Sequence, residues 1–347
     1  MKVCTHLLSS IDFCYTENAC RLPKIRGILY FACGAQHTLF NMNSRIGSTS
    51  AYSTVYSTLR RLSDHEARAT EALGRDPDSW PILCLDNVQS YSKRRDLRMG
   101  RVNQMRIGTA ATMMEAEDFL PAAMDVDDRR ARIAENKRKD ITVPLLLALV
   151  DNTHADMLGA LQWLRVLVNY VPELSGYKAK VSELYRTKGA KKQINPHRKT
   201  KVHPLATNAK NEAKTTELKD ALLDFLGQMG QHDHDYLRKL ILAGGDGLTY
   251  EKLLQLQRYM QFHGDAFQSL ELLVPILELW HLEWTDLSRI YEIHWGNYLS
   301  ADDPGTLRNS AAEIGRKEPA NLTKVDYYPY MQLAYLILDI RMLDCWR

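Results

Sequence analysis

Two short apolar runs, far apart in the chain, each lead to an aspartate. Residues 80–85 form the run Trp-Pro-Ile-Leu-Cys-Leu, which is followed by Asp86 and Asn87, and residues 236–243 lead through two glycines to Asp246. Short apolar runs that end at turn residues are typical of buried β-strands. Carboxylates that follow such strands can meet at one edge of a sheet, where facing carboxylates hold divalent metals in phosphoryl-transfer sites.

Each aspartate also has a purely structural interpretation. Asp246 lies among three glycines, and Asp and Gly are residues that turns favour. Asp86 and Asn87 can likewise end a strand and cap the next turn. A phosphate-binding loop is a weaker alternative for residues 244–247, because the Lys-Ser/Thr of a P-loop and the Gly-x-Gly-x-x-Gly pattern are both absent.

The composition is that of a folded, soluble, intracellular protein. The 347 residues suffice for one large domain or two ordinary ones, and 45% are hydrophobic and 25% charged. The net charge of +3 indicates no particular partner. The six cysteines lack zinc-type spacing, so we expect reduced thiols, with a metal clip among the four N-terminal ones as the alternative. The longest apolar run, residues 141–150, is about half a membrane span, so we expect no membrane contact.

Helical periodicity dominates the N-terminal part, residues 22–65. A short helix at 36–43, a glycine-containing turn at 45–50 and a helix at 51–62 give the outline of a helix-turn-helix, with an ordinary helical hairpin as the commoner alternative. The helical pattern continues to about Pro77.

Further helices are predicted in the rest of the chain. Apolar residues recur at helical spacing over 155–171, 215–229 and 330–346, and a helix is expected from residue 248 onward with Thr249 as a cap. Residues 103–118 mix small and β-branched residues and are expected to add strands. Because only two strands are firmly indicated, a mostly helical protein is the alternative. The chain stops at Arg347 inside a helical pattern, which predicts that further residues follow.

Two segments are strongly basic, residues 93–106 and 186–201. Clustered Lys and Arg neutralise phosphates and give salt-sensitive binding to nucleic acid. The alternatives are a solvated surface or, for the second segment, a nuclear-import signal. The expected phosphate contacts are Arg94, Arg95, Lys191, Lys192, Arg198 and Lys199.

Several stretches resemble a domain-of-unknown-function family that is expanded in mushroom-forming fungi. The matching residues are 48–62, 85–89, 201–208, 245–250, 279–286 and 339–346. The pattern is also similar to ribonuclease-H-like transposases of the cut-and-paste type. The resemblance implies DNA as the partner, a nuclear or otherwise cytoplasmic location, and metal-dependent phosphodiester cleavage or strand transfer.

The resemblance also implies a metal site with three acids. In a ribonuclease-H-like site one aspartate comes from the first strand, one from the end of the fourth, and a third acid from a later helix. Together they hold two divalent ions, here Mg²⁺ or Mn²⁺, across the scissile phosphate. Asp86 and Asp246 fit the first two positions. Among Glu278, Glu283 and Asp286, we select Asp286 as the third, since its neighbourhood matches the family pattern.

We therefore predict an α/β protein with a ribonuclease-H-like mixed sheet. Residues 1–75 form a helical segment, 76–262 the core with a helical and basic insertion at about 141–235, and 263–347 a mainly helical C-terminal part. The expected function is that of a transposase-derived DNA-binding protein, and a homo-oligomer is an open alternative to a monomer. One rival is a catalytically inactive, domesticated or decayed element that binds DNA or protein. Another is a purely structural interaction module.

Overall fold

Five strands form one mixed sheet in the computed structural model, which describes residues 2–93, 102–191, 197–297 and 303–346. The strands are β1 (Pro81–Ser92), β2 (Gln104–Glu115), β3 (Val202–Pro204), β4 (Ile241–Gly245) and β5 (Leu273–Leu277), in the spatial order β3-β2-β1-β4-β5. β1 runs antiparallel to β2 and parallel to β4, and β4 runs parallel to β5. The protein is therefore a mixed α/β protein, as predicted, with a five-stranded sheet and many helices.

Both apolar runs become central strands, with shifted boundaries. β1 places Leu83 and Leu85 in the core, and its alternating pattern of burial reflects the period of two along a strand. β4 begins at Ile241, five residues later than the sequence suggested, and continues through the two glycines. The strand prediction over 103–118 is confirmed by β2.

The chain divides into two compact units. The first contains Met1–Trp80, His203–Ala206 and Leu222–Leu237, and the second contains the remaining residues. The helices of the first unit are α1 (Lys2–Tyr15), α2 (Arg21–Ala32), α3 (His37–Arg45) and α4 (Tyr52–Arg75). α3 and α4 are the predicted helix pair. Phe40 of α3 and Val55 of α4 are fully buried; the Phe40 ring contacts Tyr52 of α4, and Val55 packs against Gly27 of α2. The turn between α3 and α4 uses Gly47 with a φ of 70°.

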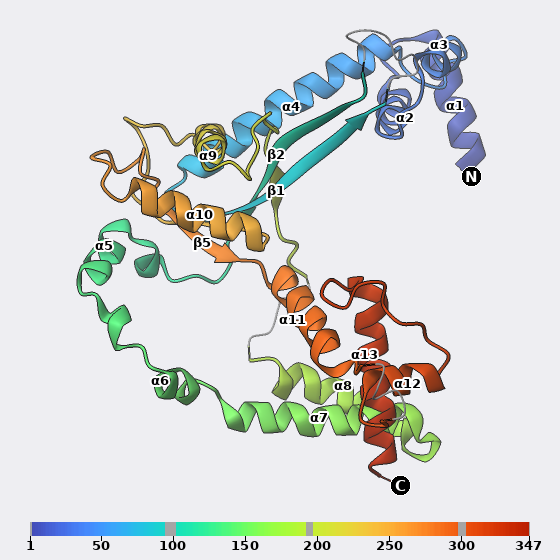
Figure 1. Ribbon diagram of the computed structural model, residues 1–347. Helices are drawn as coiled ribbons and strands as arrows, with labels where there is room; N and C mark the ends of the chain where they lie inside the picture. The colour runs from blue at the N-terminus through green and yellow to red at the C-terminus, as the bar shows by residue number, and fades with distance from the viewer. Residues whose placement is uncertain (1, 94–101, 192–196, 298–302, 347) are drawn as a thin grey trace. The chain divides into compact units, whose positions relative to one another are not determined.

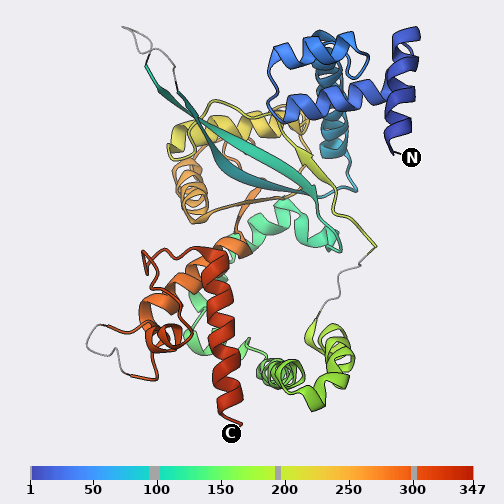
Figure 2. The same ribbon diagram turned by 90° about the vertical axis from the view of Figure 1, so that its right-hand side faces the viewer.

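The second unit contains strands β1, β2, β4 and β5 and most of the other helices (Figures 1 and 2). Its helices are α5 (Val126–Ala134), α6 (Val143–Ala148), α7 (Asn152–Tyr170), α8 (Lys178–Leu184), α10 (Gly247–Met260), α11 (Leu279–His294), α12 (Leu307–Glu313) and α13 (Tyr327–Asp344). α9 (Thr215–Gln228) begins in the second unit and continues in the first. Short irregular helices are η1 (Pro121–Met124), η2 (Lys137–Asp140), η3 (Pro172–Tyr177) and η4 (Tyr185–Gly189). The helices predicted over 155–171, 215–229 and 330–346 are confirmed.

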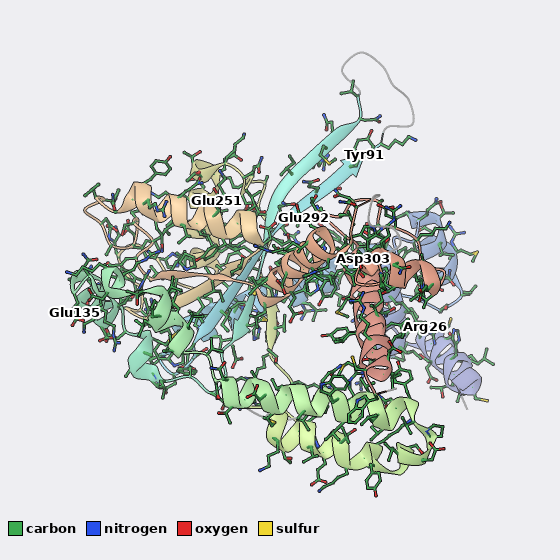
Figure 3. All side chains as sticks on the ribbon, turned by 60° about the horizontal axis from the view of Figure 1, so that its bottom comes forward. Arg26, Tyr91, Glu135, Glu251, Glu292 and Asp303 are labelled. Carbon is green, nitrogen blue, oxygen red and sulfur yellow. The ribbon has the colours of Figure 1, made fainter. Side chains whose placement is uncertain are left out.

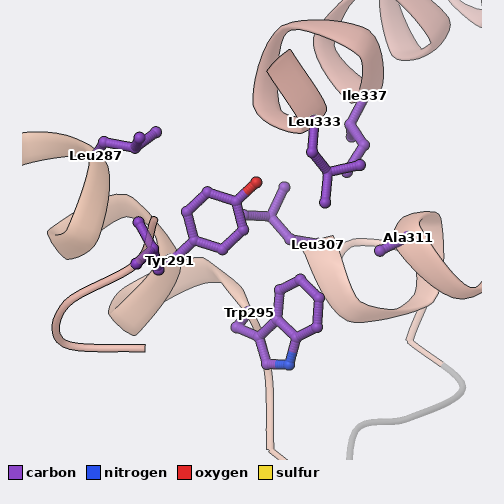
Figure 4. Packing of buried hydrophobic residues seen from close by; sticks show 8 residues of the cluster. Leu287, Tyr291, Trp295, Leu307, Ala311, Leu333 and Ile337 are labelled. Carbon is purple, nitrogen blue, oxygen red and sulfur yellow. The ribbon is translucent and has the colours of Figure 1, made fainter. Parts of the chain in front are cut away.

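The C-terminal helices have a hydrophobic core of their own (Figure 4). Tyr291 of α11, Leu307 of α12 and Leu333 of α13 are among its buried members, and Trp295, directly after α11, joins them. The Tyr291 hydroxyl donates a 2.7 Å hydrogen bond to the backbone carbonyl of Tyr330, so the buried ring keeps a polar partner. No helix within the described residues is long and apolar enough to cross a membrane.

Candidate functional site

The register of the sheet brings the two aspartates to the same place. The ladder between β1 and β4 ends at the pair Cys84 and Gly244. Asp86 and Asp246 each stand two residues beyond that pair, on neighbouring parallel strands whose spacing is about 4.8 Å. The register therefore leaves both residues at the end of the sheet where β4 ends, with Asp86 still on β1 and Asp246 just beyond β4. Asp86 is exposed and Asp246 is half-buried.

Asp246 also has the structural role that was the alternative for it. One of its carboxylate oxygens, Oδ1, accepts a 2.7 Å hydrogen bond from the Thr249 backbone N–H, which makes Asp246 the N-cap of α10. The prediction of Thr249 as the cap is wrong by three residues, because the strand ends at Gly245 and the helix begins at Gly247. The second oxygen of Asp246 takes no part in this bond.

Glu278 directly follows β5 and extends the row of carboxylates. Its side chain lies against Gly244, where a Cβ would stand 3.4 Å from the Glu278 Oε1 atom. On the same face, burial raises the pKa of the Cys84 thiol to about 11, and the Glu278 carboxylate adds to that shift. His281 places its Nε2 atom 3.7 Å from the Glu278 Oε2 atom. Glu278, one of the acids weighed for the third position, therefore lies at the same sheet edge.

Glu212 is a fourth carboxylate at this edge, and it is buried. Its side chain is 1% exposed, and neither carboxylate oxygen has a partner with acceptable hydrogen-bond geometry among the residues that the structure describes. Burial raises the pKa of Glu212; the polar side chains of Asn87 and Thr249 counteract the shift, and the charges of Asp246 and Asp86 add to it. Because the charges of both aspartates act on the Glu212 carboxyl, this carboxyl lies near both of them.

The loop that carries Glu212 is fixed to the sheet by β2. The backbones of Thr109 and Asn208 exchange two 3.1 Å hydrogen bonds, and the Thr109 hydroxyl donates a 2.8 Å bond to the Lys210 carbonyl. Thr109 is itself the ladder partner of Asn87 on β1. The chain is therefore held where Glu212, two residues after Lys210, reaches the end of the β1–β4 ladder.

Sequence reasoning missed Glu212. It stands between Lys210 and Lys214, so it resembles a member of a solvated charged surface. No local signal identifies it, because its burial depends on contacts with residues about one hundred positions earlier. Within the described part of the chain, no three carboxylate, imidazole or thiol groups are close enough to hold a metal ion as they stand.

Asp286 lies elsewhere on the second unit. It is exposed on α11 and lines a groove between this helix and α13, together with Glu283, Leu287 and Tyr335. The structure thus brings Asp86, Asp246, Glu212 and Glu278 to one edge, whereas the contacts of Asp286 are with the C-terminal helices.

The expected phosphate contacts are only partly described. Arg94, Arg95 and Lys192 lie outside the described residues. Lys191 forms a 2.8 Å ion pair with Asp151, and Arg198 contacts Glu117 and Asp118 at 2.6 and 3.2 Å. Lys199 is exposed. Such exposed ion pairs are worth about 0–1 kcal/mol, so a phosphate can replace the acid at little cost.

The fold and this edge define an α/β protein with carboxylates gathered beside the parallel strands of a mixed sheet. The chain belongs to a family of unknown function (DUF6589), whose model matches residues 136–347. The matched residues include Glu212, Asp246 and Glu278, and Asp86 precedes them. A search of curated proteins found no match to the chain, and a search of solved structures found none either.

Proposed function

We propose that the protein is a transposase-derived, DNA-binding protein with a divalent-metal site for phosphodiester cleavage or strand transfer. Asp86, Asp246 and Glu212 are the proposed ligands, with Mg²⁺ or Mn²⁺ as the metal. The observation that carries the proposal is Glu212. A buried carboxylate that has only the uncharged side chains of Asn87 and Thr249 to favour its ionised form, beside two further carboxylates, costs free energy that a bound cation would offset.

The strand order supports a ribonuclease-H-like arrangement. In that arrangement the first strand is central, antiparallel to the second and parallel to the fourth, which is the pattern of β1, β2 and β4. Asp86 lies on the first strand and Asp246 directly after the fourth, the positions that the resemblance implied. For the third acid we now propose Glu212 in place of Asp286, because the charges of both aspartates act on the Glu212 carboxyl.

The residues have distinct roles in the proposed chemistry. Asp86 is open to solvent and can reach an incoming phosphate. The bond that the Asp246 Oδ1 atom accepts from the Thr249 N–H fixes this carboxylate at the start of α10, and the Oδ2 atom is the oxygen proposed to bind the ion. When bound, divalent ions activate the attacking oxygen and stabilise the leaving one. Glu278 and His281 flank the site on the next strand end, and Lys199 and Arg198 are the proposed contacts to the DNA backbone.

Metal binding and cleavage test the proposal together. Mn²⁺ binding is measured by calorimetry, and nicking of duplex DNA is followed in Mg²⁺ or Mn²⁺. We expect binding and cleavage in the wild type, and loss of both in Asp86→Asn, Asp246→Asn and Glu212→Gln. Glu292→Gln, on the exposed face of α11 (Figure 3), is the matched control and should retain both. Binding or cleavage that survives in all three variants would sink the proposal.

An inactive binding module is the second candidate, and the capping role of Asp246 favours it. If Asp246 serves only the start of α10 and the carboxylates never assemble around an ion, DNA binding persists without metal and without cleavage. Duplex DNA that is bound with a steep salt dependence, with no metal uptake by calorimetry, is the result that selects this function.

A further inference from the structure

Helix α6 is an ordered helix that buries nothing. Every side chain in its segment, residues 141–150, is exposed, including Val143 at 68%, Leu147 at 64% and Leu149 at 74%. The Thr142 hydroxyl caps its start by accepting a bond from the Leu145 N–H. A helix this short is not stable in water by itself. We therefore expect its exposed apolar surface to pack against a partner. Figure 1 shows α6 in green.

The groove between α11 and α13 is also apolar and open to solvent, so it could bind an apolar helix such as α6. It has a volume of about 500 Å³ and rests on Leu287 and Ile337, which belong to the C-terminal core. Tyr335 and Leu338 line it and are exposed. Grooves of this type bind one face of an amphipathic helix.

The groove has an acidic end. Glu283 and Asp286 line it at the N-terminal half of α11, where the Glu283 carboxylate also accepts a bond from the Tyr327 hydroxyl. Arg341 also lines the groove. Its guanidinium donates hydrogen bonds to the carbonyls of Gly305 and Thr306, so this basic group is already used in contacts within the chain. A helix that enters the groove therefore meets negative charge at one end and apolar side chains along the rest.

The residues of η2, just before the α6 segment, carry the complementary charge. Lys137, Arg138 and Lys139 stand a few residues before the helix and are exposed. Lys137 pairs with Glu135 at 2.7 Å, a contact that is close in sequence and open to solvent. Asp140 follows these three basic residues, so the stretch before the apolar helix keeps a net positive charge, opposite in sign to Glu283 and Asp286 of the groove.

We propose that α6 of one copy of the chain docks into the α11–α13 groove of a second copy. Within one chain α6 is exposed and the groove is open, so each surface remains available to another molecule. Because the helix and the groove are different surfaces, the contact is heterologous. Each copy in a dimer keeps one unused helix or groove, so a ring or a chain of copies grows as concentration rises. This association does not depend on the proposed metal chemistry.

Molar mass in solution tests the contact. Light scattering is recorded over a concentration series for the full chain, for Leu146→Asp in α6 and for Leu338→Asp in the groove. Both positions are exposed, so both variants should fold, which circular dichroism and thermal melting check. Leu120→Asp, an exposed leucine outside both surfaces, is the matched control. We expect association of the wild type and the control, and the mass of one chain for each of the two variants.

Mixing the variants gives the decisive result. Leu146→Asp retains an intact groove and Leu338→Asp retains an intact α6, so an equimolar mixture should form a one-to-one dimer that stops growing. A wild type that stays at the mass of one chain at every concentration would overturn the proposal, as would docking of α6 within its own chain. Association that both substitutions leave unchanged, or a mixture that stays monomeric, would equally overturn it.

Discussion

Replacing Glu212 by Gln should stabilise the metal-free protein, by an amount that grows with pH. Glutamine keeps the shape of the protonated acid but cannot ionise. In the wild type, the pKa of Glu212 is above its ordinary value of 4.5, because the carboxyl is buried. The native protein therefore binds more protons than the unfolded chain once the pH exceeds about 4.5, and its stability falls as the pH rises from there until the native carboxyl ionises.

The size of the effect follows from a single proton. The free energy of unfolding of the wild type loses at most about 1.4 kcal/mol per pH unit within this window, relative to the variant. For a unit of about 250 residues, 1 kcal/mol corresponds to about 2–4 °C in Tm. The Tm of Glu212→Gln minus that of the wild type should therefore increase by up to about 3–6 °C per pH unit above pH 4.5. Below pH 4.5 this difference should no longer change with pH.

Thermal melts in a chelating buffer, taken at half-unit steps from pH 4 to pH 8, measure this difference. Glu292→Gln removes an exposed carboxylate and should not share the effect. If the Tm curves of the wild type and Glu212→Gln run parallel over the whole range, Glu212 is not a buried carboxyl with a raised pKa, and the argument for a cation at this edge loses its basis.

Three further predictions concern individual contacts. Cys84, with a pKa raised to about 11, should be alkylated far more slowly at pH 8 than the four exposed thiols, as mass spectrometry would show; equal rates would contradict its burial. Gly245→Ala should cost about 1–3 kcal/mol in a denaturant titration, because the new Cβ would stand 2.6 Å from the Thr249 Cγ2 atom; unchanged stability would refute this packing. Tyr291→Phe should cost about 1 kcal/mol through its lost bond to Tyr330, and a neutral outcome would argue against that bond.

The elements that the sequence predicted are those with a strong local pattern. The helix over 155–171 follows from a stripe of large apolar residues, and β1 follows from an uninterrupted apolar run. The end of β4 was harder to place, because Gly244 and Gly245 have the local composition of a turn and are drawn into the strand by pairing with β5. Pairing with β5 therefore determines that Gly244 and Gly245 are strand residues, which the local sequence alone does not.

The candidate site was predictable only in part, for the same reason. Asp86 and Asp246 each follow an apolar run, which a reader of the sequence can see. Glu212 becomes a neighbour of both only through the hydrogen bonds between Thr109 and Asn208, whose residues are about one hundred positions apart. Nothing within a few residues of Glu212 encodes that contact.

The parallel ladder between β1 and β4 also affects the order in which parts of the chain can fold during synthesis. It pairs Ile82 with Leu242, so β1 cannot pair with β4 until a further 160 residues have been synthesised. At about 5–20 residues per second, a ribosome needs about 10–30 s to make that stretch. During this interval β1 can pair with β2 alone, and its other edge, lined by apolar residues, is open to unwanted strand pairing. The carboxylate edge is thus among the last parts of the molecule to form, and the nascent hairpin is where we expect a chaperone to bind.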